Sequence, residues 1–311
     1  MKVSIISPFS FGYIDSLVEK VSDKSDLEVQ YINTAQISFK YSNITQRSKN
    51  IFLKMFSGRN IKKEFIEKEI ISRFEGESIQ DTILIIRPDK LSRQLLLYLK
   101  SKTDKLITYF FDSLSSFPNQ KENIDLFDKV YSYELDDVKK YNFHFITNFI
   151  PFDNFENIRG YGLFNISSYD KRFLIFSKIA MQLNDFNYPY KIVIRKEKPI
   201  STKLIEIVKD YWSLEKVHTY ILEAEVLLDI QKEDQHGLSF RVFEALGYGK
   251  KLITSNQSIV NYDFYKPENI LVINPLKPII PIRFLEQRTL DVPESIKSKY
   301  RREAWIKEVF L

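Results

Sequence analysis

The stretch VLLDIQKEDQHGLSFRVFEALGYGKKLITSN, residues 226–256, decides the fold. It opens with a short apolar run and a polar loop. Residues 239–246 then show the apolar spacing of a helix, Gly247 and Gly249 end that helix, and a second apolar run follows at 252–254. Strand, loop, helix, tight turn and strand in this order predict a βαβ unit, and such a unit implies a parallel sheet.

The start of this helix carries groups suited to an anionic ligand. Ser239 is placed to act as the N-cap, and a helix N-terminus offers unpaired backbone N–H groups and a partial positive charge, which suit a phosphate. Arg241 and Glu244 are three residues apart and therefore share one face. In one interpretation Arg241 contacts phosphate oxygens and Glu244 accepts hydrogen bonds from sugar hydroxyls. In the other, the two form an exposed ion pair of little energetic consequence.

Residues 236–256 resemble the donor-binding segment in the C-terminal domain of GT-B glycosyltransferases. Many of those proteins have a Glu, seven residues and a second Glu, then Ala-Leu/Met-x-x-Gly-Lys-Pro and a strand that ends in Thr. Glu244-Ala245-Leu246 and Gly249-Lys250 match the second half of this pattern, whereas His236 replaces the first Glu and Lys251 replaces the Pro. The resemblance implies that Glu244 contacts the ribose of a nucleotide sugar. The difference at His236 gives no support to a retaining mechanism.

The same resemblance implies further donor-side residues. In GT-B proteins the residues after the first strand of the second domain often hold the donor phosphates, which points to Lys178; a solvated helix lysine is the alternative. Residues 217–220 are expected to form a strand where similar proteins bind the nucleobase through backbone groups. The candidate donor-binding residues are Lys178, Thr219, Tyr220, Ser239, Phe240, Arg241 and Glu244.

The first half of the chain alternates short apolar runs with helical patterns. Strands are expected at 3–6, 27–32, 82–86, 106–110 and 129–133. This alternation predicts a doubly wound domain, in which ligands gather at the C-terminal ends of the strands. Phe11, Gly12 and Tyr13 follow the first strand, and we expect them on the acceptor side of a cleft.

Two acids stand where strands of this half end. Asp89 belongs to the segment Arg-Pro-Asp and Asp112 to the segment Tyr-Phe-Phe-Asp-Ser. Asp112 is our first choice, and Asp89 the second, for a carboxylate that deprotonates an acceptor hydroxyl; capping of a turn is the alternative for each. These segments and FDKVYSYELDD at 127–137 are similar to bacterial proteins encoded with capsule and lipopolysaccharide biosynthesis loci. That resemblance implies sugar transfer to a growing surface polysaccharide or a lipid-linked glycan.

Because the second half repeats the alternation of strands and helices, the sequence predicts an α/β protein with two Rossmann-like domains and a cleft between them. We expect an acceptor domain at 1–150, a linker at 151–170, and a nucleotide-sugar domain at 171–293 that begins with a strand at 172–176. A final helix at 294–311 is expected to pack back on the first domain. Peripheral contact of this helix with a membrane is the alternative.

Composition narrows the classes of function. The 311 residues include no cysteine and three histidines that lie far apart, so the sequence shows no spacing typical of a metal site. It has neither a Gly-x-Gly-x-x-Gly after the first strand nor a Walker A loop, and we expect no cofactor and no metal. The net charge of +5 suits an anionic substrate or an acidic membrane surface and is too small to indicate nucleic acid. Without a signal peptide or an apolar span, the chain is expected in the cytoplasm, with the inner face of the cell membrane as an alternative location.

Two other functions fit the same fold. A sugar-nucleotide epimerase would isomerise or hydrolyse the donor with several acids and histidines in the cleft, and this chain is poor in histidine. A binding subunit without catalysis would hold the donor only, and the presence of both Arg241 and Glu244 argues mildly against it. The donor sugar, the acceptor and the stereochemical outcome stay open at this point.

Overall fold

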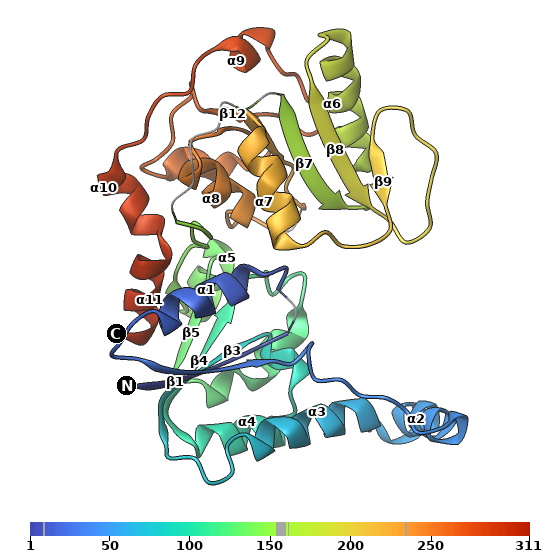
Figure 1. The fold of residues 1–311 in the computed structure, drawn as a ribbon, viewed down its shortest axis with the longest axis vertical. Helices are drawn as coiled ribbons and strands as arrows, with labels where there is room; N and C mark the ends of the chain where they lie inside the picture. The colour runs from blue at the N-terminus through green and yellow to red at the C-terminus, as the bar shows by residue number, and fades with distance from the viewer. Residues whose placement is uncertain (9, 154–159, 161, 234) are drawn as a thin grey trace.

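The computed structural model describes residues 1–8, 10–153, 160, 162–233 and 235–311. Its named strands form two separate six-stranded sheets in which neighbouring strands run parallel. Figure 1 shows one lobe built around each sheet, with helices packed on the sheets. The protein therefore has the two Rossmann-like domains that the sequence predicts.

The first sheet has the strand order β2-β1-β3-β4-β5-β6. Its strands are β1 (Lys2–Ser7), β2 (Glu28–Asn33), β3 (Gln80–Ile86), β4 (Thr103–Phe110), β5 (Lys129–Ser132) and β6 (His144–Phe145). The apolar runs that end β3 and β4 are buried, as expected for parallel strands covered on both faces. The order reverses between β1 and β3, so the loops after these strands border the crevice where doubly wound folds bind ligands.

Helices cover both faces of the first sheet. One face packs against α1 and the C-terminal helix, and the other against α3 and α4. Figure 1 shows α2 at the far end of α3, away from both sheets. The helical segments of this domain are α1 (Tyr13–Ser22), α2 (Ile44–Ser57), α3 (Ile61–Ser72), η1 (Pro88–Lys90), α4 (Arg93–Lys100), η2 (Pro118–Leu126) and α5 (Leu135–Tyr141).

The second sheet has the order β12-β11-β10-β7-β8-β9, which reverses between β7 and β10. Its strands are β7 (Leu163–Ser168), β8 (Tyr190–Arg195), β9 (Glu206–Val208), β10 (Val226–Asp229), β11 (Lys251–Thr254) and β12 (Ile270–Val272). Its helical segments are α6 (Phe173–Asp185), α7 (Leu214–Glu223), α8 (Phe240–Gly247), η3 (Gln257–Asn261) and α9 (Ile282–Glu286). The parallel pair β10 and β11 with α8 between them confirms the βαβ unit predicted for 226–256.

Two strand predictions in the second domain are wrong. Residues 172–176 lead into α6, because the apolar residues there begin a helical series that continues through Ile179, Ala180 and Leu183. A short apolar run alone does not distinguish a buried helix from a strand. Residues 217–220 lie in α7 for the same reason, with Val217 and Ile221 on its buried side.

The predicted linker also differs from the structure. Residues 163–168 were expected to lack regular structure, but they form β7, which pairs with β8 and β10. The second sheet therefore starts earlier in the chain than predicted. Residues 154–159 and 161 of the predicted linker lie outside the described residues.

The end of the chain returns to the first domain. It forms three short segments, α10 (Glu294–Lys297), η4 (Ser298–Tyr300) and α11 (Arg302–Phe310). The single helix expected at 294–311 is thus interrupted, and the backbone is extended at Arg301. Arg302 Nη1 donates a hydrogen bond to the carbonyl oxygen of Ser16 at 2.7 Å, and the ring of Trp305 contacts that of Tyr109 edge-on. This segment ties the second domain to the face of the first sheet that α1 covers.

Candidate functional site

Two cavities open at the C-terminal edge of the second sheet, which is the edge where doubly wound folds bind ligands. The smaller cavity has a volume of about 220 Å³ and lies between the two domains. Its lining includes Phe11 and Tyr13 from the first domain and Ser168, Arg195, Trp212 and Arg241 from the second. The larger cavity has a volume of about 860 Å³ and lies over the ends of β7, β10, β11 and β12.

A buried ion pair lies beneath the smaller cavity. Arg241 Nη1 is 2.7 Å from Glu244 Oε2, and the two side chains are only 11% and 1% exposed, so the interpretation as an exposed pair is wrong. The Tyr13 hydroxyl donates to Glu244 Oε1 at 2.9 Å. Burial raises the pKa of Glu244, and the charge of Arg241 and the hydrogen bond from Tyr13 oppose this shift. The carboxylate expected to contact ribose therefore has two partners within the protein.

The first turn of α8 is covered by the first domain. The ring of Phe240 stacks on that of Tyr13 with centroids 3.9 Å apart, and it contacts Phe149 edge-on. Asn148 Nδ2 donates to the carbonyl oxygen of Leu238 at 2.9 Å. Helix α8 thus begins at the domain interface, as we expected. Its residue Phe240, however, packs against side chains of the first domain and does not face an open cavity.

Ser239 occupies the N-cap position of α8 without capping it. Its hydroxyl donates instead to Asp229 Oδ1 at 2.9 Å, and Thr254 Oγ1 donates to Asp229 Oδ2 at 3.1 Å. Burial raises the pKa of Asp229, and these hydrogen bonds and the charges of Arg241 and Arg172 oppose it. A protein carboxylate therefore stands where we expected a phosphate, and it lies between two arginines.

Those two arginines line different cavities. Arg241 lines the smaller cavity, whereas Arg172 lines the larger one together with Lys178 and Lys232. Arg172 is fixed in place, because its Nη1 donates to the carbonyl oxygen of Ile230 at 2.6 Å and its Nη2 lies 2.7 Å from an oxygen of Asp170. Lys178 and Arg241 thus do not meet in one cavity, but cations follow the strand ends from one cavity to the other.

The predicted nucleobase residues lie elsewhere. Thr219 is in α7, where its hydroxyl donates to the carbonyl oxygen of Glu215. Tyr220 stacks on Phe164 and lines a separate cavity that includes Leu163 and Tyr190, at the starts of β7 and β8. Because helix formation uses the backbone groups of α7, the wrong strand prediction removes the reason for choosing Thr219 and Tyr220.

Arg195 and Trp212 line the smaller cavity and were missed from the sequence. Arg195 is the last residue of β8, whose apolar run Ile192–Ile194 is visible in the sequence, so its place at the end of a strand was the available signal. Trp212 precedes Ser213, which caps α7 by accepting from the backbone N–H of Lys216. The wrong prediction for α7 concealed that signal.

Asp112 and Asp89 share Arg87 but differ in environment. Arg87 Nε and Nη2 each lie 2.8 Å from a carboxylate oxygen of Asp89, whereas Arg87 Nη1 is 3.7 Å from Asp112. For Asp89, burial is outweighed by the hydrogen bonds and charge of Arg87, and the pKa of Asp89 is lowered. For Asp112, burial dominates over the charge of Arg87, and the pKa of Asp112 is raised. Gln235 Nε2 from the second domain is 3.5 Å from Asp112 Oδ1, so Asp112 faces the cleft.

A third cavity, of about 440 Å³, lies between the domains and reaches Ser113, the residue after Asp112; Asp112 itself does not line it. It is lined by Ser113, Ser115, Glu134, Asp136, Lys140 and His236 among others. The cavity brings hydroxyl and carboxylate groups together, and its nearest residue along the chain to the proposed base is Ser113. Acids at the start of the helix after β5 were visible in the sequence, but their place at the interface was not.

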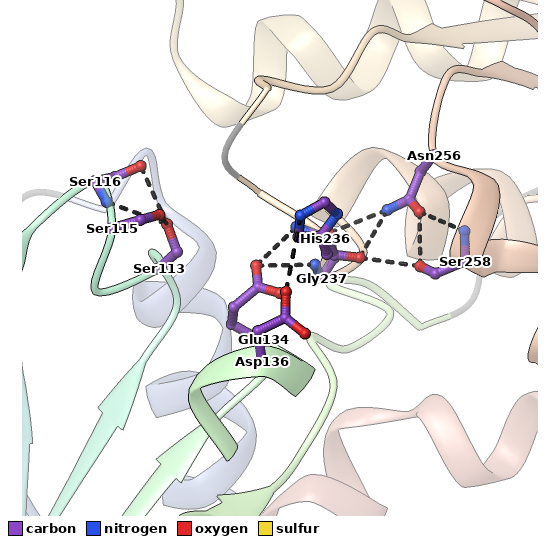
Figure 2. A network of polar contacts seen from close by, with 9 residues as sticks. All are labelled: Ser113, Ser115, Ser116, Glu134, Asp136, His236, Gly237, Asn256 and Ser258. Atoms are coloured by element: carbon purple, nitrogen blue, oxygen red, sulfur yellow. Dashed lines mark hydrogen bonds and ion pairs between the residues drawn. The ribbon is translucent and has the colours of Figure 1, made fainter. Parts of the chain in front are cut away.

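The third cavity is bounded by a network that joins the two domains (Figure 2). Glu134 Oε2 accepts hydrogen bonds from the backbone N–H groups of His236 at 2.8 Å and Gly237 at 3.1 Å. The ring of His236 lies 3.8 Å from Asp136, and its carbonyl oxygen accepts from Asn256. The loop before α8 is therefore held against the first domain, and His236 borders both the larger and the third cavity.

Phe11, Gly12 and Tyr13 face the second domain. The ring of Phe11 lies 5.3 Å from that of Tyr211, and a Cβ on Gly12 would come within 2.8 Å of the Leu214 side chain. Gly12 also has a φ of +87°, so the close approach of the domains requires glycine here. These residues adjoin Arg241, on the side where we expected the donor, rather than the third cavity.

No family model matches the sequence, and no curated protein matches it. Solved structures do match over nearly the whole chain. The UDP-GlcNAc 2-epimerase from Methanocaldococcus jannaschii, in complex with UDP-GlcNAc and UDP, is 12% identical with a TM-score of 0.54, and the match covers 99% of both chains. An alpha-glucosyltransferase in complex with UDP and a 13-mer DNA is 11% identical with a TM-score of 0.53, and the match covers 99% of this chain and 90% of that one. The UDP-forming trehalose-phosphate synthase from Burkholderia xenovorans is 10% identical with a TM-score of 0.51, covering 98% and 97%.

At these identities the matches establish the fold, which is the GT-B arrangement of two Rossmann-like domains. Glycosyltransferases and UDP-GlcNAc 2-epimerases both occur among the matching structures, so the fold alone does not separate transfer from epimerisation. Among the described residues, no three metal-ligating side chains gather closely enough to hold an ion.

Proposed function

We propose that this protein is a metal-independent glycosyltransferase that moves a sugar from a nucleoside diphosphate to an acceptor hydroxyl. The observation that carries the proposal is the pairing of cation-lined cavities on the second domain with a carboxylate of raised pKa, Asp112, on the first. Several proteins of this fold were solved with UDP or a UDP-sugar, which supports the choice of donor class.

The donor is proposed to extend along the strand ends of the second domain. Its nucleoside binds in the smaller cavity, where Trp212 offers an aromatic surface and Arg195 and Arg241 supply positive charge. The diphosphate is proposed to lie in the larger cavity, at Arg172 and Lys178. Positive side chains placed at the leaving diphosphate stabilise the charge that develops as the glycosidic bond breaks.

The acceptor is proposed to bind in the third cavity, next to Asp112. Its hydroxyl gives a proton to the Asp112 carboxylate as its oxygen forms a bond to the anomeric carbon, and the bond from that carbon to the diphosphate oxygen breaks. A direct displacement of this kind inverts the anomeric configuration. The acceptor class we propose is a growing surface polysaccharide or a lipid-linked glycan, on the basis of the sequence resemblance.

Epimerisation of a nucleotide sugar is the second candidate, because the matches to UDP-GlcNAc 2-epimerases cover 99% of this chain. Of the three histidines, His236 is the one that lines a cavity among those described here. His218 packs between Phe152 and Tyr248, and burial lowers its pKa. The described cavities thus offer a single histidine, although the third cavity also contains the acids Glu134, Asp136 and Asp137.

The test has two stages. First, a thermal-shift screen against nucleotides and nucleotide sugars should show a donor, since a ligand at a hundred times its Kd stabilises the folded state by about 2.7 kcal/mol. Second, the donor is incubated with and without glycan acceptors, and free nucleotide and the epimeric sugar are both measured. Nucleotide release that requires an acceptor supports transfer. Conversion of the donor without any acceptor supports epimerisation, and binding without turnover supports a non-catalytic subunit.

A further inference from the structure

Helix α2 exposes an unusual amount of apolar surface. Of its fourteen residues, only Asn50 is buried. The exposed apolar side chains are Ile44 at 82%, Ile51 at 54%, Phe52 at 60%, Met55 at 74% and Phe56 at 71%. Contiguous apolar surface on this scale marks an interaction site rather than a scattered set of exposed residues.

The exposed side chains form one face of the helix. At about 100° per residue, Ile44, Ile51, Phe52, Met55 and Phe56 fall within an arc of about 140°. The rings of Phe52 and Phe56 lie 4.3 Å apart, one turn from each other, and form the centre of an aromatic ridge on this face. We call these five residues the α2 apolar face.

The apolar face is not what attaches α2 to the protein. The attachment is polar and lies on the opposite side, where Asn50 Nδ2 donates to the Tyr41 hydroxyl at 2.7 Å and Asn50 Oδ1 accepts from the backbone N–H of Ile61 at 2.8 Å. The helix also has complete ends, with the Asn43 side chain accepting at its start and Gly58 in the left-handed region at its end. These contacts orient the apolar face away from the protein, and Figure 1 shows α2 apart from both lobes.

The charge around this face is of one sign. By the same helical geometry, Arg47 and Lys54 flank the apolar arc on one side and Lys49 flanks it on the other. The sequence of α2, ITQRSKNIFLKMFS, contains no acid; Arg59, two residues beyond its end, is paired with Glu64. An apolar arc between basic flanks is the pattern of a helix that lies in the plane of an anionic membrane.

We propose that α2 binds the surface of an anionic lipid bilayer, with the α2 apolar face inserted among the acyl chains and its basic flanks at the headgroups. A second copy of this chain is a poorer partner, because pairing two α2 faces would bring Arg47, Lys49 and Lys54 of both copies together without a carboxylate from either helix. A helix of this length with almost no buried residues is also marginal in water, and lipid would stabilise it. No helix among the described residues is long and apolar enough to cross a bilayer, so this contact would be peripheral.

The test is flotation of the full chain with vesicles of phosphatidylcholine alone and of phosphatidylcholine with phosphatidylglycerol. The wild type should float with the anionic vesicles. Phe52→Ser with Phe56→Ser should reduce the bound fraction about tenfold or more, since two exposed rings lose their burial in lipid. Lys49→Glu with Lys54→Glu should reduce binding to anionic vesicles by at least about fivefold per lysine.

Matched controls lie on the second domain or at the end of the chain. Met181→Ser with Ile279→Ser removes two apolar side chains that are 56% and 55% exposed, and it should leave flotation unchanged. Lys198→Glu with Lys307→Glu makes the same change in net charge at exposed positions and should have a much smaller effect. A Phe52→Trp variant should be quenched by brominated lipids beyond the wild-type signal. Circular dichroism should show that every variant keeps the wild-type fold.

Three results would overturn the proposal. One is that the wild type floats with neither kind of vesicle. Another is that both control variants lose binding as much as the α2 variants. The third is that the wild type is a dimer by sedimentation, ignores lipid, and becomes a monomer on Phe52→Ser with Phe56→Ser, which would assign the face to a second copy. All three readouts are independent of donor turnover, so failure here would leave the proposed function untouched.

Discussion

The smaller and the larger cavity, at the strand ends of the second sheet, differ in their contacts with the first domain. The domains are in contact at the smaller cavity. The Tyr13 hydroxyl donates a hydrogen bond to Glu244, and its ring stacks on Phe240. Gly12 lies close to the side chain of Leu214. At the larger cavity the cations Arg172, Lys178 and Lys232 line an opening of about 860 Å³. Contacts between the domains narrow the smaller cavity to about 220 Å³, and the larger one has more room for a ligand.

The difference indicates that residues at the smaller cavity contribute mainly to stability and those at the larger cavity mainly to turnover. Arg241 lines the smaller cavity, whereas its partner Glu244 is buried beneath it and receives the hydrogen bond of Tyr13 from the first domain. At the larger cavity Arg172 is paired with Asp170, and Lys178 and Lys232 line the same opening. Changes on the larger side should therefore affect turnover, whereas changes beneath the smaller cavity should first affect stability.

The largest effect is expected for Asp112→Asn. If Asp112 takes the proton from the acceptor, its amide replacement should lower turnover by about 10²–10⁴-fold while donor affinity stays close to that of the wild type. Rates and donor Kd are measured by nucleotide release and by calorimetry. Asp125→Asn, an exposed carboxylate of the same domain paired with Arg93, serves as the matched control and should keep wild-type turnover. A larger loss with Asp89→Asn than with Asp112→Asn would instead make Asp89 the base.

The second largest effect is expected on the free energy of unfolding, for residues beneath the smaller cavity. Arg241→Met leaves the Glu244 carboxylate buried with only the Tyr13 hydroxyl as partner, and breaking such a pair lowers the free energy of unfolding by about 3–5 kcal/mol. Adding Glu244→Gln removes the isolated charge and should restore much of that loss. Urea denaturation of the two single variants and the double variant measures the coupling.

An exposed pair gives the contrast for this cycle. Arg93 and Asp125 have side chains that are 50% and 59% exposed, so Arg93→Met should lower the free energy of unfolding by no more than about 1 kcal/mol. If Arg241→Met were as mild as Arg93→Met, burial would not make the pair beneath the smaller cavity costly to break, and the contrast between the two cavities would be wrong.

The fold was predictable from the sequence because its evidence is local. The apolar runs of β3, β4, β10 and β11 are short, bounded by turn residues, and fully buried, and the βαβ unit at 226–256 fixes the parallel pairing. The failure at 172–176 arises where four apolar residues begin a buried helix, and 217–220 is a short segment inside a helix that starts at Leu214. There, only the later positions, such as Ile179 and Leu183, distinguish a period of 3.6 from a strand.

The candidate site was predictable only in part, because half of it depends on contacts between domains. The i, i+3 spacing of Arg241 and Glu244 indicated their pairing, and the position of Asp112 after a buried strand indicated a cleft residue. Nothing local shows that Tyr13 reaches Glu244 or that Glu134 holds the backbone of His236, since these partners are more than a hundred residues apart. The N-cap role of Ser239 failed for a different reason: Asp229, ten residues earlier in the same βαβ unit, accepts a hydrogen bond from its hydroxyl.

The smallest expected effect tests the direction in which the pKa of Asp112 is shifted. Burial raises the pKa of Asp112, so ionising this carboxyl at neutral pH opposes folding; the stability that its neutral form gives is complete below the unfolded pKa and is lost as pH rises through the folded pKa. Asp112→Asn should therefore have a Tm at pH 7 equal to or slightly above that of the wild type, despite losing the charge near Arg87. The difference should shrink as pH falls below about 3.9, where an ordinary aspartate is protonated in both states. A clear drop in Tm at pH 7 would show that the ion pair with Arg87 outweighs burial. Asp112 would then be a structural residue, like Arg241 and Glu244, rather than the catalytic base.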